Sequence, residues 1–178
     1  MGLVKIPNEE VRAEFEKILR RSKHHTLIEF VRRSDRLLED TLSGDEEAVA
    51  SAIEEIRDSE YAPTFYNDEQ SLRYVVKLAY LTCIDQYARI EELPSGHGIA
   101  DLVMIPKRRS ALPAIIIELK WNRSAEGAIS QILERNYTAA LKAYGGDLVL
   151  VGINYDEKSK HHTCKIERTQ IQAARNAH

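Results

Sequence analysis

The chain has 178 residues, of which 43% are hydrophobic and 30% charged, with a formal net charge of −3. This composition is typical of a globular protein and excludes a disordered or fibrous chain. No apolar run approaches the roughly 18 residues that cross a membrane, and no signal-peptide pattern opens the sequence, so we expect a cytoplasmic protein without a membrane span.

Charge and cysteines add two weaker indications. Residues 1–95 contain 13 basic and 20 acidic residues, a net charge of −7, whereas residues 96–178 contain 12 and 8, a net charge of +4. The second half of the chain is therefore the part expected to attract a polyanion.

Cys83 and Cys164 have no metal-site spacing and are predicted to be reduced core thiols.

The first part of the chain has the rhythm of helices. Apolar residues recur at helical spacing in residues 8–21, 25–42 and 43–58, with Asn8 and then Ser43 or Asp45 as N-caps. Pro63 interrupts this pattern. We therefore predict a helical N-terminal region over residues 1–62, acting as a lid or connector, and a second domain over residues 63–178.

The second domain is predicted to alternate strands with helices. An amphipathic helix over residues 68–83 precedes strands at 87–94, 99–106 and 114–121. A helix then begins at the N-cap Ser124 and ends at Gly145-Gly146, and strands follow at 147–156 and 161–168. The order α-β-β-β-α-β requires an α/β fold, in which helices flank a mixed central sheet.

The stretch AIIIELKW places charged residues at the end of a buried strand. A symmetric hairpin between residues 99–106 and 114–121 pairs Met104 with Ile115, and the same register sets Asp101 opposite Glu118. Two carboxylates about 5 Å apart do not both ionise unless a cation lies between them, and oxygen ligands favour Mg²⁺ or Mn²⁺. Lys120 shares this face and can act on an attacking water, so the trio fits phosphodiester hydrolysis.

The sequence GHGIAD followed by IIIELK resembles the Asp…Glu-x-Lys motif of the PD-(D/E)XK nuclease superfamily. More narrowly, the chain is similar to the nuclease-like domain found C-terminal to AAA-ATPase-like modules in many bacterial proteins. The matching stretches include NDEQSLRYVVKLAYL, ELPSGHGIADLVMIPK, AISQILERNYTAAL and VLVGINYD. The resemblance implies the restriction-endonuclease-like core and a Mg²⁺- or Mn²⁺-dependent nuclease that cleaves DNA, with RNA as the second choice.

The resemblance also implies roles for single residues. Asp101 and Glu118 correspond to metal ligands and Lys120 to the catalytic lysine. Glu69 corresponds to an acidic residue aimed at the metal, and Gln131 to a glutamine that lines the site. Tyr137 corresponds to a recurring tyrosine of the narrower group and is a candidate nucleic-acid contact.

Several of these residues have plainer explanations. Glu69 in the first turn of a helix also interacts with the helix dipole, Gln131 is equally consistent with a solvated side chain, and Tyr137 fits core packing. The basic turn Lys107-Arg108-Arg109 either follows nucleic-acid phosphates or serves solubility. Trp121 is expected in the core rather than on a base-stacking platform.

Two other functions remain open at this level. The first is a non-catalytic module that binds nucleic acid or protein and works with a partner AAA-type ATPase. The chain has no GxxxxGK[ST] motif, so the ATPase would be a separate protein or a missing N-terminal module. The second is a nuclease that acts only as a homodimer, in which the two subunits present two active sites to a nucleic-acid duplex.

Overall fold

The computed structural model describes residues 25–60, 66–95, 98–107, 111–135, 141 and 146–171. The elements in order are α2 (His25–Ser43), α3 (Glu46–Glu60), α4 (Glu69–Ala79), the 3-10 helix η2 (Leu81–Asp85), β1 (Tyr87–Ser95), β2 (Gly98–Pro106), β3 (Ala114–Trp121), α5 (Ala125–Glu134), β4 (Gly146–Asp156) and β5 (His161–Ile171). The helix predicted over residues 8–21 lies outside the described residues. In the described part of the chain, no helix is both long and apolar enough to cross a membrane.

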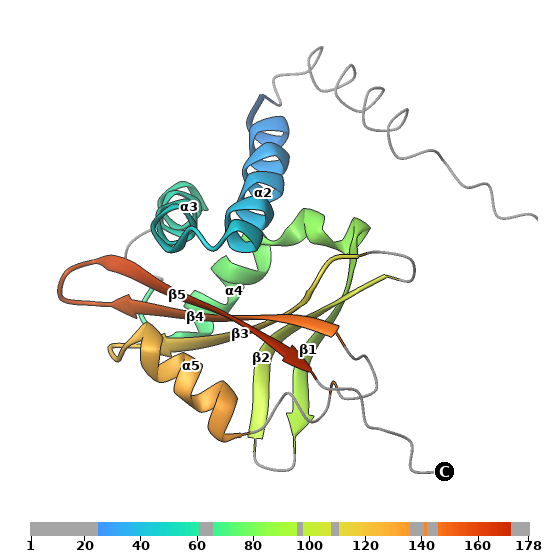
Figure 1. The fold of residues 1–178 in the computed structure, drawn as a ribbon. Helices are drawn as coiled ribbons and strands as arrows, with labels where there is room; N and C mark the ends of the chain where they lie inside the picture. Colours follow the sequence, from blue (N-terminus) through green and yellow to red (C-terminus); the bar gives the residue numbers. More distant parts are fainter. Residues whose placement is uncertain are drawn as a thin grey trace, which may run out of the picture.

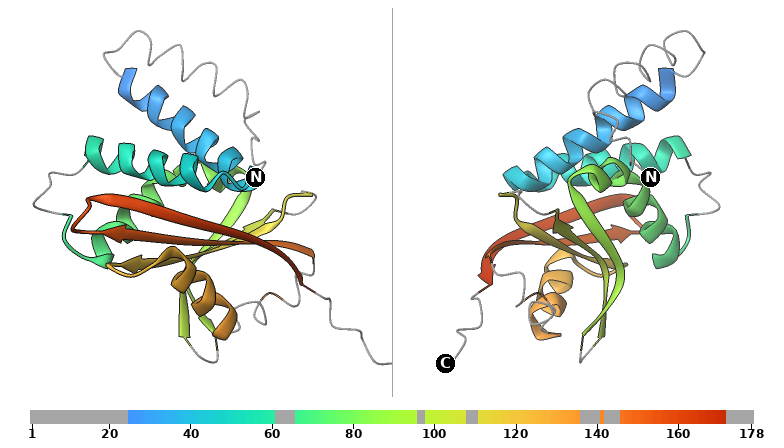
Figure 2. Two further views of the ribbon diagram at one scale, coloured as in Figure 1. Left: turned by 60° about the vertical axis from the view of Figure 1, so that its left-hand side comes forward. Right: turned by 90° about the vertical axis from the view of Figure 1, so that its right-hand side faces the viewer.

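The five strands form one sheet in the order β1-β2-β3-β4-β5. Neighbouring strands are antiparallel, except that β3 and β4 run parallel because α5 carries the chain across the sheet between them. Helices α2, α3 and α4 cover one face and α5 the other (Figures 1 and 2). This is the predicted α/β fold, with a mixed sheet flanked by helices, and it is consistent with a restriction-endonuclease-like core.

Two hydrophobic clusters fill the two sides of the sheet. The larger one joins α2, α3 and α4 to alternate residues of the strands, including Ile115, Ile117 and Leu119 of β3. The smaller one contains Ile116 of β3 together with Ile129 and Ile132 of α5. Strand β3 is buried on both faces, which explains its run of isoleucines.

Polar residues fix the ends of the helices as expected. The Ala48 N–H donates to Asp45 Oδ1 at 3.0 Å, so Asp45 caps α3. Asp68 and Ser71 form a capping box at the start of α4, and Ser124 caps α5 by accepting from the Gly127 N–H. The N-cap predicted at Ser124 is thus confirmed.

The predicted helix over residues 68–83 is too long. Helix α4 ends at Ala79, and residues 81–85 form the 3-10 helix η2. Tertiary contacts explain the change, because the Tyr80 hydroxyl lies 2.7 Å from Thr41 Oγ1 and Thr82 Oγ1 donates to Ser34 Oγ at 2.9 Å. Anchoring to α2 overrides the helical pattern of the sequence.

Candidate active site

Register places Asp101 beside Glu118. The paired residues of β2 and β3 are Met104 with Ile115, Val103 with Ile116 and Leu102 with Ile117, as the sequence predicted. The backbone pairing ends there, and Asp101 and Glu118 are the next residues along each strand. Both are buried, with exposed fractions of 5% and 2%.

Asp101 joins three elements. Its Oδ2 accepts a hydrogen bond of 2.9 Å from the Leu119 N–H of β3, a donor that faces β2 where the backbone pairing has ended. Its Oδ1 forms an ion pair with the guanidinium of Arg73, which α4 supplies. A buried carboxylate with hydrogen-bond and ionic partners is tolerated in a sheet.

Lys120 lies between a carboxylate and an amide. Its Nζ donates to Glu118 Oε1 at 3.2 Å and to Gln131 Oε1 at 2.7 Å. The lysine is 8% exposed, and Gln131 is half-buried on α5. The structure therefore brings Gln131 to Lys120.

Gly152 of β4 allows α5 to approach this closely. It lies next to Glu118 in the parallel pair β3–β4. A Cβ at this position would lie 2.2 Å from the Ala125 carbonyl oxygen and 2.9 Å from the Ala128 Cβ, both on α5. The absence of a side chain thus lets α5 pack directly on the sheet and extend Gln131 toward Lys120.

Glu118 has an unusual electrostatic environment. Burial and, to a smaller extent, the nearby Asp101 carboxylate raise the pKa of Glu118 to about 7, although Lys120 opposes both effects. Within the described residues, its buried Oε2 has no hydrogen-bond partner. Oε2 of Glu118 is therefore a buried carboxylate oxygen to which no described residue donates a hydrogen bond.

This donor set fits a hard divalent cation. Asp101 and Glu118 offer carboxylate oxygens, the ligands that Mg²⁺ and Mn²⁺ prefer, and Oε2 of Glu118 is available to one. The described residues contain no group of three His, Cys, Asp or Glu side chains arranged to hold a metal. Glu69 is exposed in the first turn of α4 and does not complete such a group.

The predicted nucleic-acid contacts lie elsewhere or outside the described residues. Lys107 follows β2 at the end opposite Asp101, about 20 Å away along the strand, and its Nζ donates to the Ile84 carbonyl of η2. Arg108, Arg109 and Tyr137 are not among the residues that the structure describes. Of the basic turn, the described residue Lys107 therefore lies apart from the Asp101–Glu118 site.

Trp121 confirms the expected core packing. Its ring centroid lies 5.4 Å from that of Tyr66 and 4.6 Å from that of Tyr155, against the larger hydrophobic cluster. Neither cysteine forms a disulfide, and Cys83 is buried while Cys164 is partly buried.

Two polar neighbours of the site were missed by sequence reasoning. Asn154 is 3% exposed, pairs with Lys120 across β3–β4 and accepts from the Arg123 N–H at 2.9 Å. Arg73 contacts Asp101 from a position 28 residues earlier in the chain. The available signal for Arg73 was a charged residue at the border of the apolar stripe of α4, three residues before the buried Val76.

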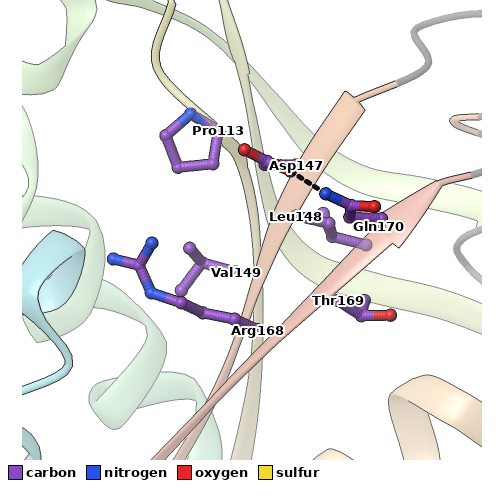
Figure 3. A pocket seen from close by; sticks show the side chains of 7 residues that line it. All are labelled: Pro113, Asp147, Leu148, Val149, Arg168, Thr169 and Gln170. Carbon is purple, nitrogen blue, oxygen red and sulfur yellow. Dashed lines mark hydrogen bonds between the residues drawn. The ribbon is translucent and has the colours of Figure 1, made fainter.

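A separate hollow of about 260 Å³ lies at the other end of the sheet (Figure 3). Its lining comes from the β4 and β5 ends and from Pro113, and Asp147 accepts a hydrogen bond of 3.0 Å from Gln170 at its rim. It adjoins the Ala114–Leu148 pair, whereas the candidate site adjoins the Lys120–Asn154 pair. The hollow is therefore not part of the candidate site.

Comparison with known proteins supports the same part of the chain. Residues 68–165 match a family model described as the PD-(D/E)XK nuclease superfamily. This match covers more than half of the chain and includes Asp101, Glu118, Lys120 and Gln131. No curated protein matches the chain at a significant level.

Proposed function

The chain belongs to the PD-(D/E)XK nuclease superfamily, and on that basis we propose that it is a metal-dependent nuclease that hydrolyses phosphodiester bonds of DNA. RNA is the second choice of substrate. The observation that carries the proposal is the convergence of Asp101, Glu118, Lys120 and Gln131 at one end of β3.

Asp101 and Glu118 are the proposed ligands of Mg²⁺ or Mn²⁺. The buried Oε2 of Glu118, which has no hydrogen-bond partner among the described residues, supports this role, because a buried carboxylate oxygen is costly without a cation or a donor. When bound, such a cation lowers the pKa of a water molecule and stabilises negative charge on a phosphoryl oxygen.

Lys120 is the proposed catalytic lysine. An ammonium group has three N–H groups, and Glu118 and Gln131 accept from two of them. These two contacts hold Nζ in place, and the remaining N–H can orient the attacking water or donate to a phosphate oxygen. Gln131 is then a positioning residue that acts through Lys120.

The test is a cleavage assay on single-stranded, duplex and branched DNA and on RNA, in Mg²⁺, Mn²⁺ or EDTA. We expect metal-dependent cleavage by the wild-type protein and a loss of at least about 100-fold in Lys120→Ala. Lys158→Ala, an exposed turn residue, is the control and should cleave normally. Cleavage that persists in EDTA or in Lys120→Ala would contradict the proposal.

A second candidate function is a non-catalytic module that binds nucleic acid or protein, with an AAA-type ATPase as its partner. One observation favours it: Arg73 and the Leu119 N–H already engage both carboxylate oxygens of Asp101. Binding of nucleic acid without cleavage in any metal would support this alternative.

A further inference from the structure

Arg73 supplies a positive charge directly at the proposed metal site. It comes from the second turn of α4, and its Nη2 contacts Asp101 Oδ1. The arginine side chain is 19% exposed and the aspartate side chain 7% exposed. Because the pair is largely shielded from water, it is stronger than an ion pair on the surface.

The two carboxylates of the site differ in how they are neutralised. Asp101 has partners for both oxygens, Arg73 on Oδ1 and the Leu119 N–H on Oδ2. Glu118 shares Oε1 with Lys120, and its Oε2 has no partner in the part of the chain that the structure describes. A divalent cation thus finds one oxygen available on Glu118 and competes with a guanidinium on Asp101.

We propose that Arg73 is the internal counter-ion of Asp101, which a divalent cation displaces from Oδ1 when it binds, so that Arg73 sets the metal affinity of the site. The inference rests on the proposed metal binding by Asp101 and Glu118. It assigns a function to a residue outside the Asp…Glu-x-Lys motif.

The local structure permits this exchange without movement of the helix. The capping box between Asp68 and Ser71 fixes the start of α4, with the Ser71 N–H donating to Asp68 Oδ1 at 2.7 Å. The long side chain of Arg73 can therefore rotate while its backbone stays in place. Its partial exposure gives the released guanidinium access to water.

The counter-ion also has a structural effect in the metal-free protein. A buried carboxylate that loses its cation is strongly disfavoured, because its desolvation is no longer compensated. Arg73 thus stabilises the folded protein in the absence of metal. A bound cation makes the same contribution to Asp101, so the need for Arg73 falls when metal is present.

The experiment measures Mn²⁺ affinity by calorimetry and by the electron paramagnetic resonance signal of free Mn²⁺, on the full chain. Arg73→Gln removes the charge and keeps a hydrogen-bond donor, and we expect it to bind Mn²⁺ about tenfold more tightly than wild type. Lys77→Gln removes a charge one turn later on the same helix and should change the affinity by less than about twofold. An affinity of Arg73→Gln that equals or falls below that of wild type would overturn the proposal.

Thermal unfolding gives an independent readout. Arg73→Gln should lower the midpoint in EDTA clearly more than in saturating Mn²⁺, because the cation replaces the lost charge. Equal decreases in both conditions would overturn the proposal. If Arg73→Gln does not fold, Arg73→Lys replaces it, because lysine keeps the charge but pairs more weakly with Asp101. Arg73→Lys should bind Mn²⁺ a few-fold more tightly than wild type. Unchanged or weaker binding would overturn the proposal.

The outcomes separate this inference from the nuclease proposal. If Mn²⁺ binds but no nucleic acid is cleaved, the nuclease proposal fails and the ratio of affinities still decides the role of Arg73. If neither the wild type nor Arg73→Gln binds Mn²⁺, both proposals fail. Cleavage together with equal Mn²⁺ affinities supports the nuclease and refutes the counter-ion.

Discussion

Gly152 offers a direct test of how α5 is positioned, because α5 packs directly on the backbone of this residue, which is the neighbour of Glu118 in the sheet. In Gly152→Ala, the new Cβ would lie 2.2 Å from the Ala125 carbonyl oxygen and 2.9 Å from the Ala128 Cβ. Carbon and oxygen atoms normally approach to about 3.3 Å, so α5 must move outward by about 1 Å.

The expected magnitude follows from this displacement. Overpacking of this kind costs about 1–3 kcal/mol of the free energy of unfolding, and each kcal/mol lowers the unfolding midpoint by about 2–4 °C in a domain of this size. The same movement draws Gln131 away from Lys120, to which it is now bonded at 2.7 Å. A displacement of this positioning residue by about 1 Å should lower turnover by about 10-fold to 100-fold.

Circular dichroism during heating measures the midpoint, and the cleavage assay measures turnover. Gly127→Ala is the matched control, because it adds a methyl group to α5 that meets only the Ser124 hydroxyl, at 3.0 Å. Its stability should change by no more than about 1 kcal/mol in either direction. An unchanged midpoint in Gly152→Ala would refute the close packing of α5 on β4.

Two further predictions concern pH and the lysine. Burial, aided by Arg57, lowers the pKa of His162 to about 4 from its ordinary 6.5, so the unfolded chain takes up a proton between these values that the folded protein does not. The free energy of unfolding should therefore fall by up to about 3 kcal/mol from pH 7 to pH 4, and His162→Gln should reduce this loss. Urea unfolding at both pH values measures the effect. Midpoints that shift equally with pH in the wild type and in His162→Gln would contradict this role of His162. Gln131→Leu removes the acceptor that holds Lys120 Nζ, so turnover should fall by about 10-fold to 100-fold. The affinity for Mn²⁺ should stay constant. Unchanged turnover would show that Gln131 has no part in the mechanism.

The register of the site could be predicted from the sequence. Side chains alternate across a strand with a period of two, and a symmetric hairpin between residues 99–106 and 114–121 sets one alignment of β3 with β2. Met104 therefore pairs with Ile115, which leaves Asp101 and Glu118 as the next residues on the two strands. The order of elements followed from equally local signals, such as the Ser124 cap.

The contacts of Arg73 could not be predicted in the same way. A helical pattern shows that Arg73 borders the buried face of α4, but the strand that it meets depends on how the helix packs on the sheet. Asp101 is 28 residues away, and its carboxylate becomes accessible to α4 only where pairing between β2 and β3 ends. The end of α4 at Ala79 depends likewise on contacts with α2.

Other sequence predictions stay open. Glu69 is exposed, and its role as a metal ligand remains a prediction. The division at residue 62, the homodimer and the AAA-type partner are also predictions, although side chains of α2 and α3 share one hydrophobic cluster with the sheet.

The most direct test of the central claim is the single-turnover cleavage rate of a DNA substrate as a function of Mg²⁺ concentration, in wild type and in Glu118→Gln. The account predicts a rate that rises with Mg²⁺ and saturates, disappears in EDTA and falls by at least about 100-fold in the variant. A rate independent of Mg²⁺, or equal in the two proteins, would contradict the assignment of Glu118 as a metal ligand of a nuclease.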